Sequence, residues 1–206
     1  MEYYIYDIPV FVLQEPENTV SLPALCEEVE NVLPRRVFRN IDVIYIGDFK
    51  ELQGRNAAFS NGAIYMSCLE PTNFDMLENV VHEAAHSLEN SYGMQIYTVD
   101  LETEFLGKRR RLCSLLSARG YDVNDKLCAD AEYSEKFDEF LSTEVGYPTL
   151  VSLTMGLFVT PYAATSLQEY FANGFEKYFL DSPRAIEKIS PILYQKIEEI
   201  INEDKA

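Results

Sequence analysis

The segment His82-Glu83-Ala84-Ala85-His86 constrains this chain most, because it holds both of its histidines. Residues four apart on an α-helix lie on one face about one turn from each other, so two imidazoles at this spacing converge. Apolar residues recur at helical spacing from Leu77 to Leu88, and Asn73 is the expected N-terminal cap. We therefore predict a helix that carries both histidines on one face.

The order of residue types in this segment, H-E-x-x-H, is typical of a catalytic zinc site. Neutral imidazoles bind Zn²⁺, and the ion makes a bound water more acidic. A carboxylate beside that water can accept its proton as the water attacks a carbonyl carbon. We predict that His82 and His86 bind one zinc ion and that Glu83 is the general base of peptide hydrolysis. A helix whose histidines make only hydrogen bonds is the alternative.

Composition limits the partners of the chain. With 206 residues and 47% apolar content, the chain suits one domain with an ample core. The net charge of −17 repels the phosphates of nucleic acids and anionic lipids, so neither nucleic acid nor membrane is an expected partner. A basic or neutral peptide suits this charge better. The sequence shows no signal-peptide pattern and no membrane-span length, so a cytoplasmic location is the default expectation.

Strand patterns come before the histidine segment. Strands are expected over 3–13 and 41–46, with a helix over 22–33 between them. Residues 57–67 are expected to form two short strands around an Asn61-Gly62 turn, or one interrupted edge strand. Pro9 is expected at a sheet edge or a bulge. If residues 57–67 lie at an edge, they can pair with an extended peptide substrate; an ordinary covered strand is the alternative.

Helical patterns dominate after the histidine segment, and we expect helices over 101–118, 131–145, 147–158, 164–180 and 183–203. The basic run over 108–111 is predicted to form a solvated helix face. The fold class is therefore α+β, with a small N-terminal mixed sheet and a mainly helical C-terminal half. We expect a single domain over 1–206, with a sheet lobe of about 1–93 and a helical lobe of about 94–206.

A catalytic zinc normally has three protein ligands, and no third histidine is present, so a carboxylate or a cysteine must complete the set. Glu169 is the best-placed candidate, because it is a charge in a segment whose apolar residues predict a helix committed to the core. A solvated helix charge is the alternative. Asn173, one turn later, is predicted to orient a ligating histidine. Gly174 in the same helix predicts a close approach of another backbone.

The segments 82–90 (HEAAHSLEN) and 161–179 (PYAATSLQEYFANGFEKYF) resemble the catalytic core of the anthrax-lethal-factor-like metallopeptidases, a gluzincin group that includes the clostridial Pro-Pro endopeptidases. In that family a second helix carries a glutamate ligand in an E-[YF]-F-A setting, and a tyrosine seven residues earlier projects into the site. Glu169 and Tyr162 match these positions. The resemblance implies a zincin-like fold in which His82, His86 and Glu169 bind zinc and Tyr162 donates a hydrogen bond to the developing oxyanion.

This resemblance covers less than half of the chain, and the stretch between its two segments is longer than the family pattern. Extra helices are therefore expected within 95–150. The predicted function is a zinc-dependent endopeptidase acting on a protein or peptide, and a proline-containing substrate follows from the resemblance only. The alternative is a binding or structural protein, such as a virion or complex component, that retains a zincin scaffold and its zinc without catalysis.

Overall fold

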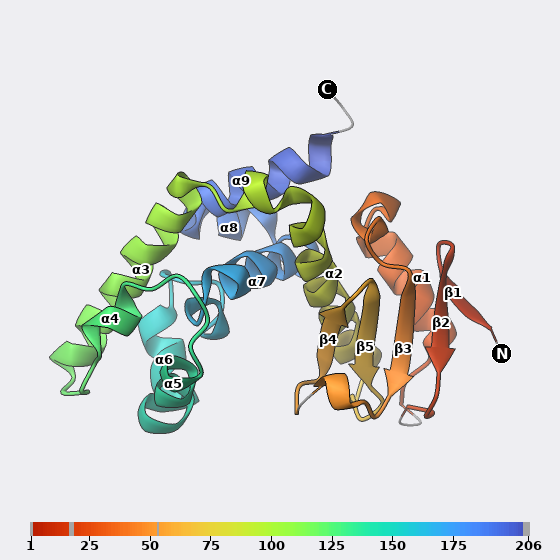
Figure 1. Cartoon of the computed structure of the whole chain (residues 1–206), viewed down its shortest axis with the longest axis horizontal. Helices are drawn as coiled ribbons and strands as arrows, with labels where there is room; N and C mark the ends of the chain where they lie inside the picture. Colours follow the sequence, from red (N-terminus) through yellow and green to blue (C-terminus); the bar gives the residue numbers. More distant parts are fainter. Residues whose placement is uncertain (1, 17–18, 53, 204–206) are drawn as a thin grey trace. The chain divides into compact units, whose positions relative to one another are not determined.

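The computed structural model describes residues 2–16, 19–52 and 54–203 (Figure 1). The chain divides into two compact units, Met1–Gly93 and Met94–Ala206. The α+β class is confirmed: the first unit contains a five-stranded mixed sheet, and the rest of the described chain is mainly helical. None of the helices in these described ranges combines the length and apolar composition that a transmembrane span requires.

The sheet of the first unit has the strand order β1-β2-β3-β5-β4. Strands β2 (Ile8–Val12), β3 (Val43–Gly47) and β5 (Ala63–Ser67) are parallel, and β1 (Tyr3–Ile5) and β4 (Ala57–Ser60) run antiparallel to their neighbours. The strand predicted over 3–13 is therefore two strands, with Tyr6 at a positive φ of 56° in the turn between them. The predicted Asn61-Gly62 turn is confirmed, and its φ angles of 51° and 79° suit a two-residue hairpin.

Pro9 lies in the interior strand β2 and in an unbroken register with β1, so its expected place at a sheet edge or a bulge is wrong. It pairs with Tyr4 of β1, while the pairing of β2 with β3 begins at Val10. Proline is tolerated here because no residue of β3 pairs with position 9 and needs its missing N–H.

One face of the sheet packs into the core of the first unit with helices α1 (Leu22–Val32) and α2 (Asn73–Ile96), which lie on the same side of it (Figure 1). Side chains that alternate along the strands are buried there, together with the apolar face of each helix: Val10, Ile44, Ile46, Ile64, Met66, Leu25, Val29, Val80, Val81, Ala84, Ala85 and Leu88. The opposite face carries stacked aromatic rings, with Tyr45 5.8 Å from Phe11 and 5.5 Å from Tyr65. Period-two alternation along these strands is what directs the two sets to opposite faces.

Thr72 caps the helix that carries the histidines. Its hydroxyl accepts a hydrogen bond from the Asp75 N–H at 3.2 Å and donates to the Asp75 carboxylate at 2.5 Å. The predicted cap, Asn73, exchanges hydrogen bonds with the backbone of Ser21 at the start of α1, so the capping prediction for Asn73 is wrong. The reciprocal bonds of Thr72 and Asp75 satisfy the first turn of α2 and leave the side chain of Asn73 to join the two helices.

The second unit contains α3 (Val99–Ala118), α4 (Asp125–Cys128), α5 (Glu135–Glu139), a π-helical segment Phe140–Gly146, α6 (Tyr147–Thr154), a short 3₁₀ turn η4 (Tyr162–Ala164), α7 (Leu167–Leu180), α8 (Pro183–Ile189) and α9 (Pro191–Asn202). The helix predicted over 183–203 is two helices, because Pro191 has no N–H to continue α8. Gly174 of α7 faces Leu193 of α9, and a Cβ at Gly174 would collide with that side chain. The close neighbour of Gly174 is therefore a side chain of α9.

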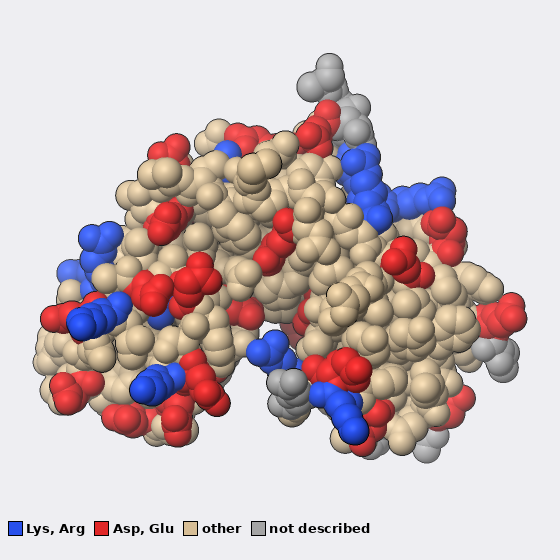
Figure 2. Space-filling view, viewed as in Figure 1, with Lys and Arg blue, Asp and Glu red and all other residues tan. Residues whose placement is uncertain are grey.

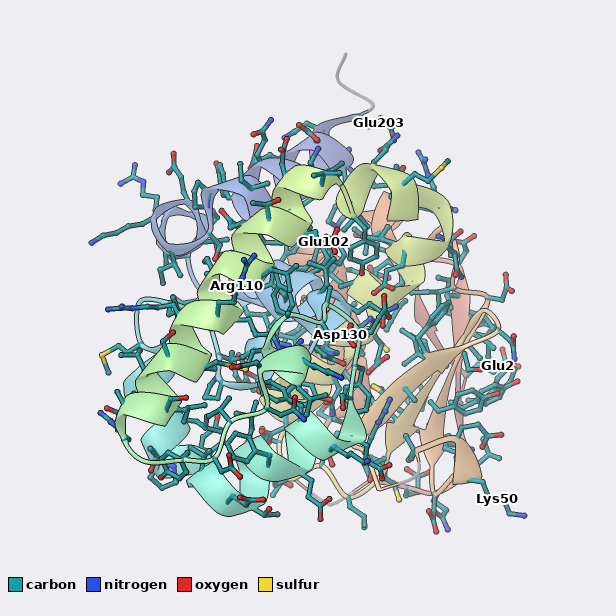
Figure 3. The ribbon with its side chains drawn as sticks, turned by 60° about the vertical axis from the view of Figure 1, so that its left-hand side comes forward. Glu2, Lys50, Glu102, Arg110, Asp130 and Glu203 are labelled. Carbon is teal, nitrogen blue, oxygen red and sulfur yellow. A yellow bond between two sulfur atoms is a disulfide. The ribbon has the colours of Figure 1, made fainter. Side chains whose placement is uncertain are left out.

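The basic run of α3 is only partly solvated. Arg110 (Figure 3) and Arg111 are exposed, whereas Arg109 is fully buried and Lys108 is partly buried, so the predicted solvated face is wrong for these two. Position 109 lies one turn after Phe105 and on the same helix face, which is apolar and turned into the core. The position of Arg109 on the helix, and not its charge, therefore determines that its side chain is buried.

Cys113 of α3 and Cys128 of α4 form a disulfide, and Cys26 and Cys68 are free and buried. The pairing did not follow from the spacing of the cysteines in the sequence. Disulfides are rare in reducing compartments, so this bond is an argument against the expected cytoplasmic location.

Candidate metal centre

The two histidines of α2 lie side by side at one point of the helix surface. Their Nε2 atoms are 3.2 Å apart, and their ring centroids are 4.9 Å apart. Two nitrogens bound to one Zn²⁺ at roughly 2.0–2.1 Å with a tetrahedral angle would be about 3.3 Å apart. The spacing of His82 and His86 therefore fits a shared zinc ion without rearrangement of the helix.

Glu89 fixes the orientation of one of these rings. Its Oε1 atom lies 2.7 Å from Nδ1 of His86, and only 15% of the Glu89 side chain is exposed. An Nδ1–H that donates to this carboxylate leaves the lone pair of Nε2 directed at His82. Sequence reasoning missed Glu89. Its signal was an acidic residue three positions after His86, on the same helix face.

Glu83, between the two histidines, is almost fully buried with 8% of its surface exposed. Its Oε2 atom accepts a hydrogen bond of 2.7 Å from the backbone N–H of Phe59 in β4. One carboxylate oxygen is thereby held against the edge of the sheet. Sequence reasoning also missed this contact, because it joins residues that are far apart in the chain.

Strand β4 lies at the edge of the sheet in the part of the chain that the structure describes. The backbone oxygen of Asn56 accepts a hydrogen bond from the Ser67 N–H of β5. In an antiparallel ladder the direction of the backbone groups alternates along the strand. The backbone groups of Ala57 and Phe59 therefore point away from β5. The contact of the Phe59 N–H with Glu83 agrees with this direction. The outward-facing N–H of Phe59 at this edge is therefore already bound by the predicted general base, Glu83.

Glu169 lies in the first turn of α7 in the second unit. The Ser166 hydroxyl caps this helix by accepting a hydrogen bond of 3.1 Å from the Glu169 N–H, so the backbone at Glu169 is fixed at the start of the helix. Glu169 is partly buried, whereas Tyr170 and Phe171 after it are fully buried. The predicted helix, with Glu169 next to inward-facing aromatic residues, is thus present.

Asn173 makes its hydrogen bonds within the second unit. Its Nδ2 atom donates to the Glu169 carbonyl oxygen at 2.8 Å, and its Oδ1 atom accepts from the Thr160 hydroxyl at 2.6 Å. The same Thr160 oxygen accepts a bond of 3.1 Å from the Ala163 N–H in the turn that carries Tyr162. Asn173 therefore anchors that turn to α7, and its predicted contact with a ligating histidine stays a prediction.

Tyr162 is 38% exposed at the start of the η4 turn, and its carbonyl oxygen accepts hydrogen bonds from the backbone N–H and the hydroxyl of Thr165. The backbone of this residue is thereby fixed. Its phenol is accessible enough to meet a ligand, as an oxyanion donor must be.

Among the described residues, His82, His86 and Glu169 are a group of side chains that could hold a metal ion. Two imidazole nitrogens and one carboxylate oxygen are a donor set that catalytic zinc sites use. Comparisons of the chain with protein-family models, with curated proteins and with solved structures found no match. A function for this site is therefore inferred from its side chains alone.

Proposed function

We propose that this chain is a zinc-dependent endopeptidase with a zincin-like fold. The observation that carries the proposal is the 3.2 Å separation of the Nε2 atoms of His82 and His86. The residue that follows His82 on the same helix, Glu83, is a buried carboxylate that the Phe59 N–H holds. A site that only stabilised the fold would need no carboxylate beside the ion.

His82 and His86 of the first unit and Glu169 of the second would hold the ion, and Glu89 would orient His86. Zinc in such a site supplies a Lewis acid that lowers the pKa of water and polarises a carbonyl group. The participation of Glu169 requires that the first turn of α7 meets the histidine face of α2 in the working protein, and this meeting is part of the proposal.

Glu83 acts as the general base in this proposal. Its carboxylate accepts a proton from the attacking water and returns it to the amine that leaves when the peptide bond breaks. Because the Phe59 N–H holds Oε2, the other oxygen, Oε1, is the one that accepts this proton. The Tyr162 hydroxyl donates a hydrogen bond to the carbonyl oxygen as negative charge develops on it.

The substrate would be an extended peptide that adds to the edge of β4, at the outward-facing backbone groups that Glu83 does not occupy. Main-chain hydrogen bonds to an edge strand hold a peptide without regard to its sequence. The metal site beside the strand then determines which peptide bond is cleaved. The net charge of −17 favours a basic or neutral peptide over an acidic one.

Cleavage of a diverse peptide library, read by mass spectrometry, tests the proposal with Glu83→Gln as the matched variant. We expect cuts with the wild-type protein, none with Glu83→Gln, and equal zinc content in both proteins. Cuts that persist in Glu83→Gln would exclude this base. A wild-type protein that binds zinc and cleaves no peptide would instead indicate a non-catalytic zinc scaffold.

Metal analysis of ligand variants tests the donor set separately. We expect His82→Ala and Glu169→Ala to lose zinc, and Glu176→Ala, a change of the same kind two turns further along α7, to retain it. Stoichiometric, tightly held zinc in Glu169→Ala would remove Glu169 from the set and leave the histidine pair in place.

A further inference from the structure

A cavity of about 450 Å³ lies in the first unit, where β2 and β3 begin. Its charged lining consists of Arg35, Arg36, Arg39, Asp7 and Asp42. The volume is within the range of small-molecule sites, which is about 300–1,000 Å³. None of these side chains belongs to the candidate metal centre, and the proposed peptidase chemistry does not use them.

Positive charge is concentrated at this cavity. The first 93 residues contain five lysines and arginines, Arg35, Arg36, Arg39, Lys50 and Arg55, and three of the five line the cavity. Acidic side chains, by contrast, are spread widely over the face shown in Figure 2. In a chain of net charge −17, such a cluster is a local site for an anion.

The local structure holds the arginines in place. They lie on or directly after η1 (Arg35–Phe38), a single 3₁₀ turn that follows α1. Val37 and Phe38 of this turn are buried, and the Arg39 N–H donates a hydrogen bond to the Arg36 carbonyl oxygen. Anchored backbone positions reduce the entropy that would be lost when a ligand binds.

The three arginines of the lining differ in their contacts. Arg35 pairs with Asp7 at 2.9 Å, at a position where both side chains are about two-thirds exposed, at 68% and 69%. Arg39 donates to the Tyr92 hydroxyl at 3.2 Å. The Nε–H of Arg36 is buried without a hydrogen-bond partner. A buried donor without an acceptor costs free energy, so an acceptor that reaches Arg36 would be bound favourably.

We propose that this cavity binds a small ligand through a carboxylate or phosphate group, with Arg36 and Arg39 as its main contacts. A guanidinium presents its N–H groups in a planar fork that matches the oxygen atoms of both anions. The two aspartates reduce the charge of the lining from +3 to +1, so the site fits one anionic head group and excludes a polyanion. Ile8, Phe38 and Ile41 complete the lining and contact the apolar body of the ligand.

Titration with phenyl phosphate and with benzoate, at constant ionic strength and followed by isothermal calorimetry, tests this proposal. Each probe joins an apolar ring to one of the two head groups. We expect saturable one-site binding of at least one probe, weakened at least about tenfold in both Arg36→Gln and Arg39→Gln. Arg55→Gln removes an exposed arginine of the same unit outside the cavity, and we expect it to bind like the wild type.

The pattern across the probes and variants decides the outcome. Binding of phenyl phosphate alone indicates a phosphate monoester as the ligand class, and binding of benzoate alone indicates a carboxylate. Arg36→Lys keeps the charge and lacks the planar fork, so we expect weakened binding with an unchanged circular dichroism spectrum. The absence of saturable binding of both probes would overturn the proposal. Binding that is equal in all variants would also overturn it, because the probe would then bind at another site, such as a metal ion.

Discussion

The carboxylate of Glu89 lies 2.7 Å from Nδ1 of His86, one helical turn further along α2. This contact gives Glu89 a measurable role in metal binding. Glu89→Gln keeps the size of the side chain and removes its charge, so the Nδ1–H of His86 loses a strong acceptor. We expect zinc affinity, measured by competition with a chelator, to fall about 10- to 100-fold.

Glu102→Gln is the control for this variant. Glu102 is an exposed acid of α3 (Figure 3), and its substitution changes the net charge by the same amount. We expect the zinc affinity of Glu102→Gln to equal that of the wild type. An equal loss in the two variants would assign the effect to net charge rather than to the contact with His86.

Thr160 and Asn173 form a second contact with a measurable energy. Their hydrogen bond of 2.6 Å is partly buried and joins the turn of Tyr162 to α7. In a double-mutant cycle of Thr160→Val and Asn173→Ala, we expect a coupling of about 1 kcal/mol in the free energy of unfolding. A peptidase assay of Asn173→Ala should also show a lower kcat at nearly unchanged zinc content, because the turn of Tyr162 is released.

A cycle of Asn173→Ala with Thr103→Val is the matched comparison. The Thr103 hydroxyl donates to the Val99 carbonyl oxygen within α3 and shares no partner with Asn173. Coupling in this cycle should be close to zero. Coupling of the same size in both cycles would mean that the Thr160 bond has no specific effect.

The local parts of the fold could be predicted from the sequence. The helix with His82 and His86, the Asn61-Gly62 turn and the α+β order depend on patterns within a few residues, so spacing alone indicates them. The tertiary contacts could not be predicted. Glu83 meets the backbone of Phe59 only because β4 is at the sheet edge, and strand order is not visible in the sequence.

Two contacts that follow from helix periodicity were missed because the residue type alone did not indicate them. Glu89 is one of 34 acidic residues, so its position after His86 was not informative until the structure placed it against the ring. Arg109 occupies a position on the buried face of α3, and it is buried despite its charge. In both cases the face of the helix predicts the contact better than the residue type does.

Arg109 gives a prediction about stability. Its guanidinium lies 4.2 Å from the ring centroid of Phe137 and donates to the Asp130 carbonyl oxygen at 2.7 Å, while its Nε and Nη2 atoms have no hydrogen-bond partner. We expect Arg109→Ala to lower the free energy of unfolding by about 3 kcal/mol, because a large buried side chain is removed. Arg109→Met fills most of the space without unpaired donors and should lose less than half as much.

Denaturant unfolding of both variants and of Arg110→Ala measures this difference. Arg110 is exposed on the same helix (Figure 3), so its substitution should change stability by less than about 0.5 kcal/mol. An Arg109→Met variant that is as unstable as Arg109→Ala would show that the charge itself stabilises the second unit.

The disulfide between Cys113 and Cys128 closes a loop of sequence separation 15. Replacing both cysteines by alanine should destabilise the protein by about 3 kcal/mol, the loop-entropy value for this length. Thiol titration of the denatured protein should detect only Cys26 and Cys68 before reduction. Detection of all four thiols in freshly purified, unreduced protein would contradict the disulfide.

Lys108 predicts a pH dependence of stability. Burial lowers its pKa from 10.5 to about 8, an effect that the nearby Glu104 carboxylate partly offsets. Its Nζ atom donates to the Ile189 carbonyl oxygen and the Ser190 hydroxyl, both at 2.6 Å, and lies over the ring of Tyr170. Between about pH 8 and pH 10.5 the unfolded chain binds a proton here that the folded chain has released, so this residue makes the free energy of unfolding rise with pH.

Lys108→Met removes this titration and keeps the length of the apolar stem. Other groups titrate equally in both proteins, so the stability of the wild type minus that of Lys108→Met should increase as the pH rises from 7.5 to 10, measured by urea unfolding. Burial also raises the pKa of the neighbouring Tyr170 above its ordinary value, so that phenol stays neutral across this range. A difference that is constant with pH would mean that Lys108 keeps its ordinary pKa, and a difference that decreases would mean that the folded state holds the proton more tightly than the unfolded chain.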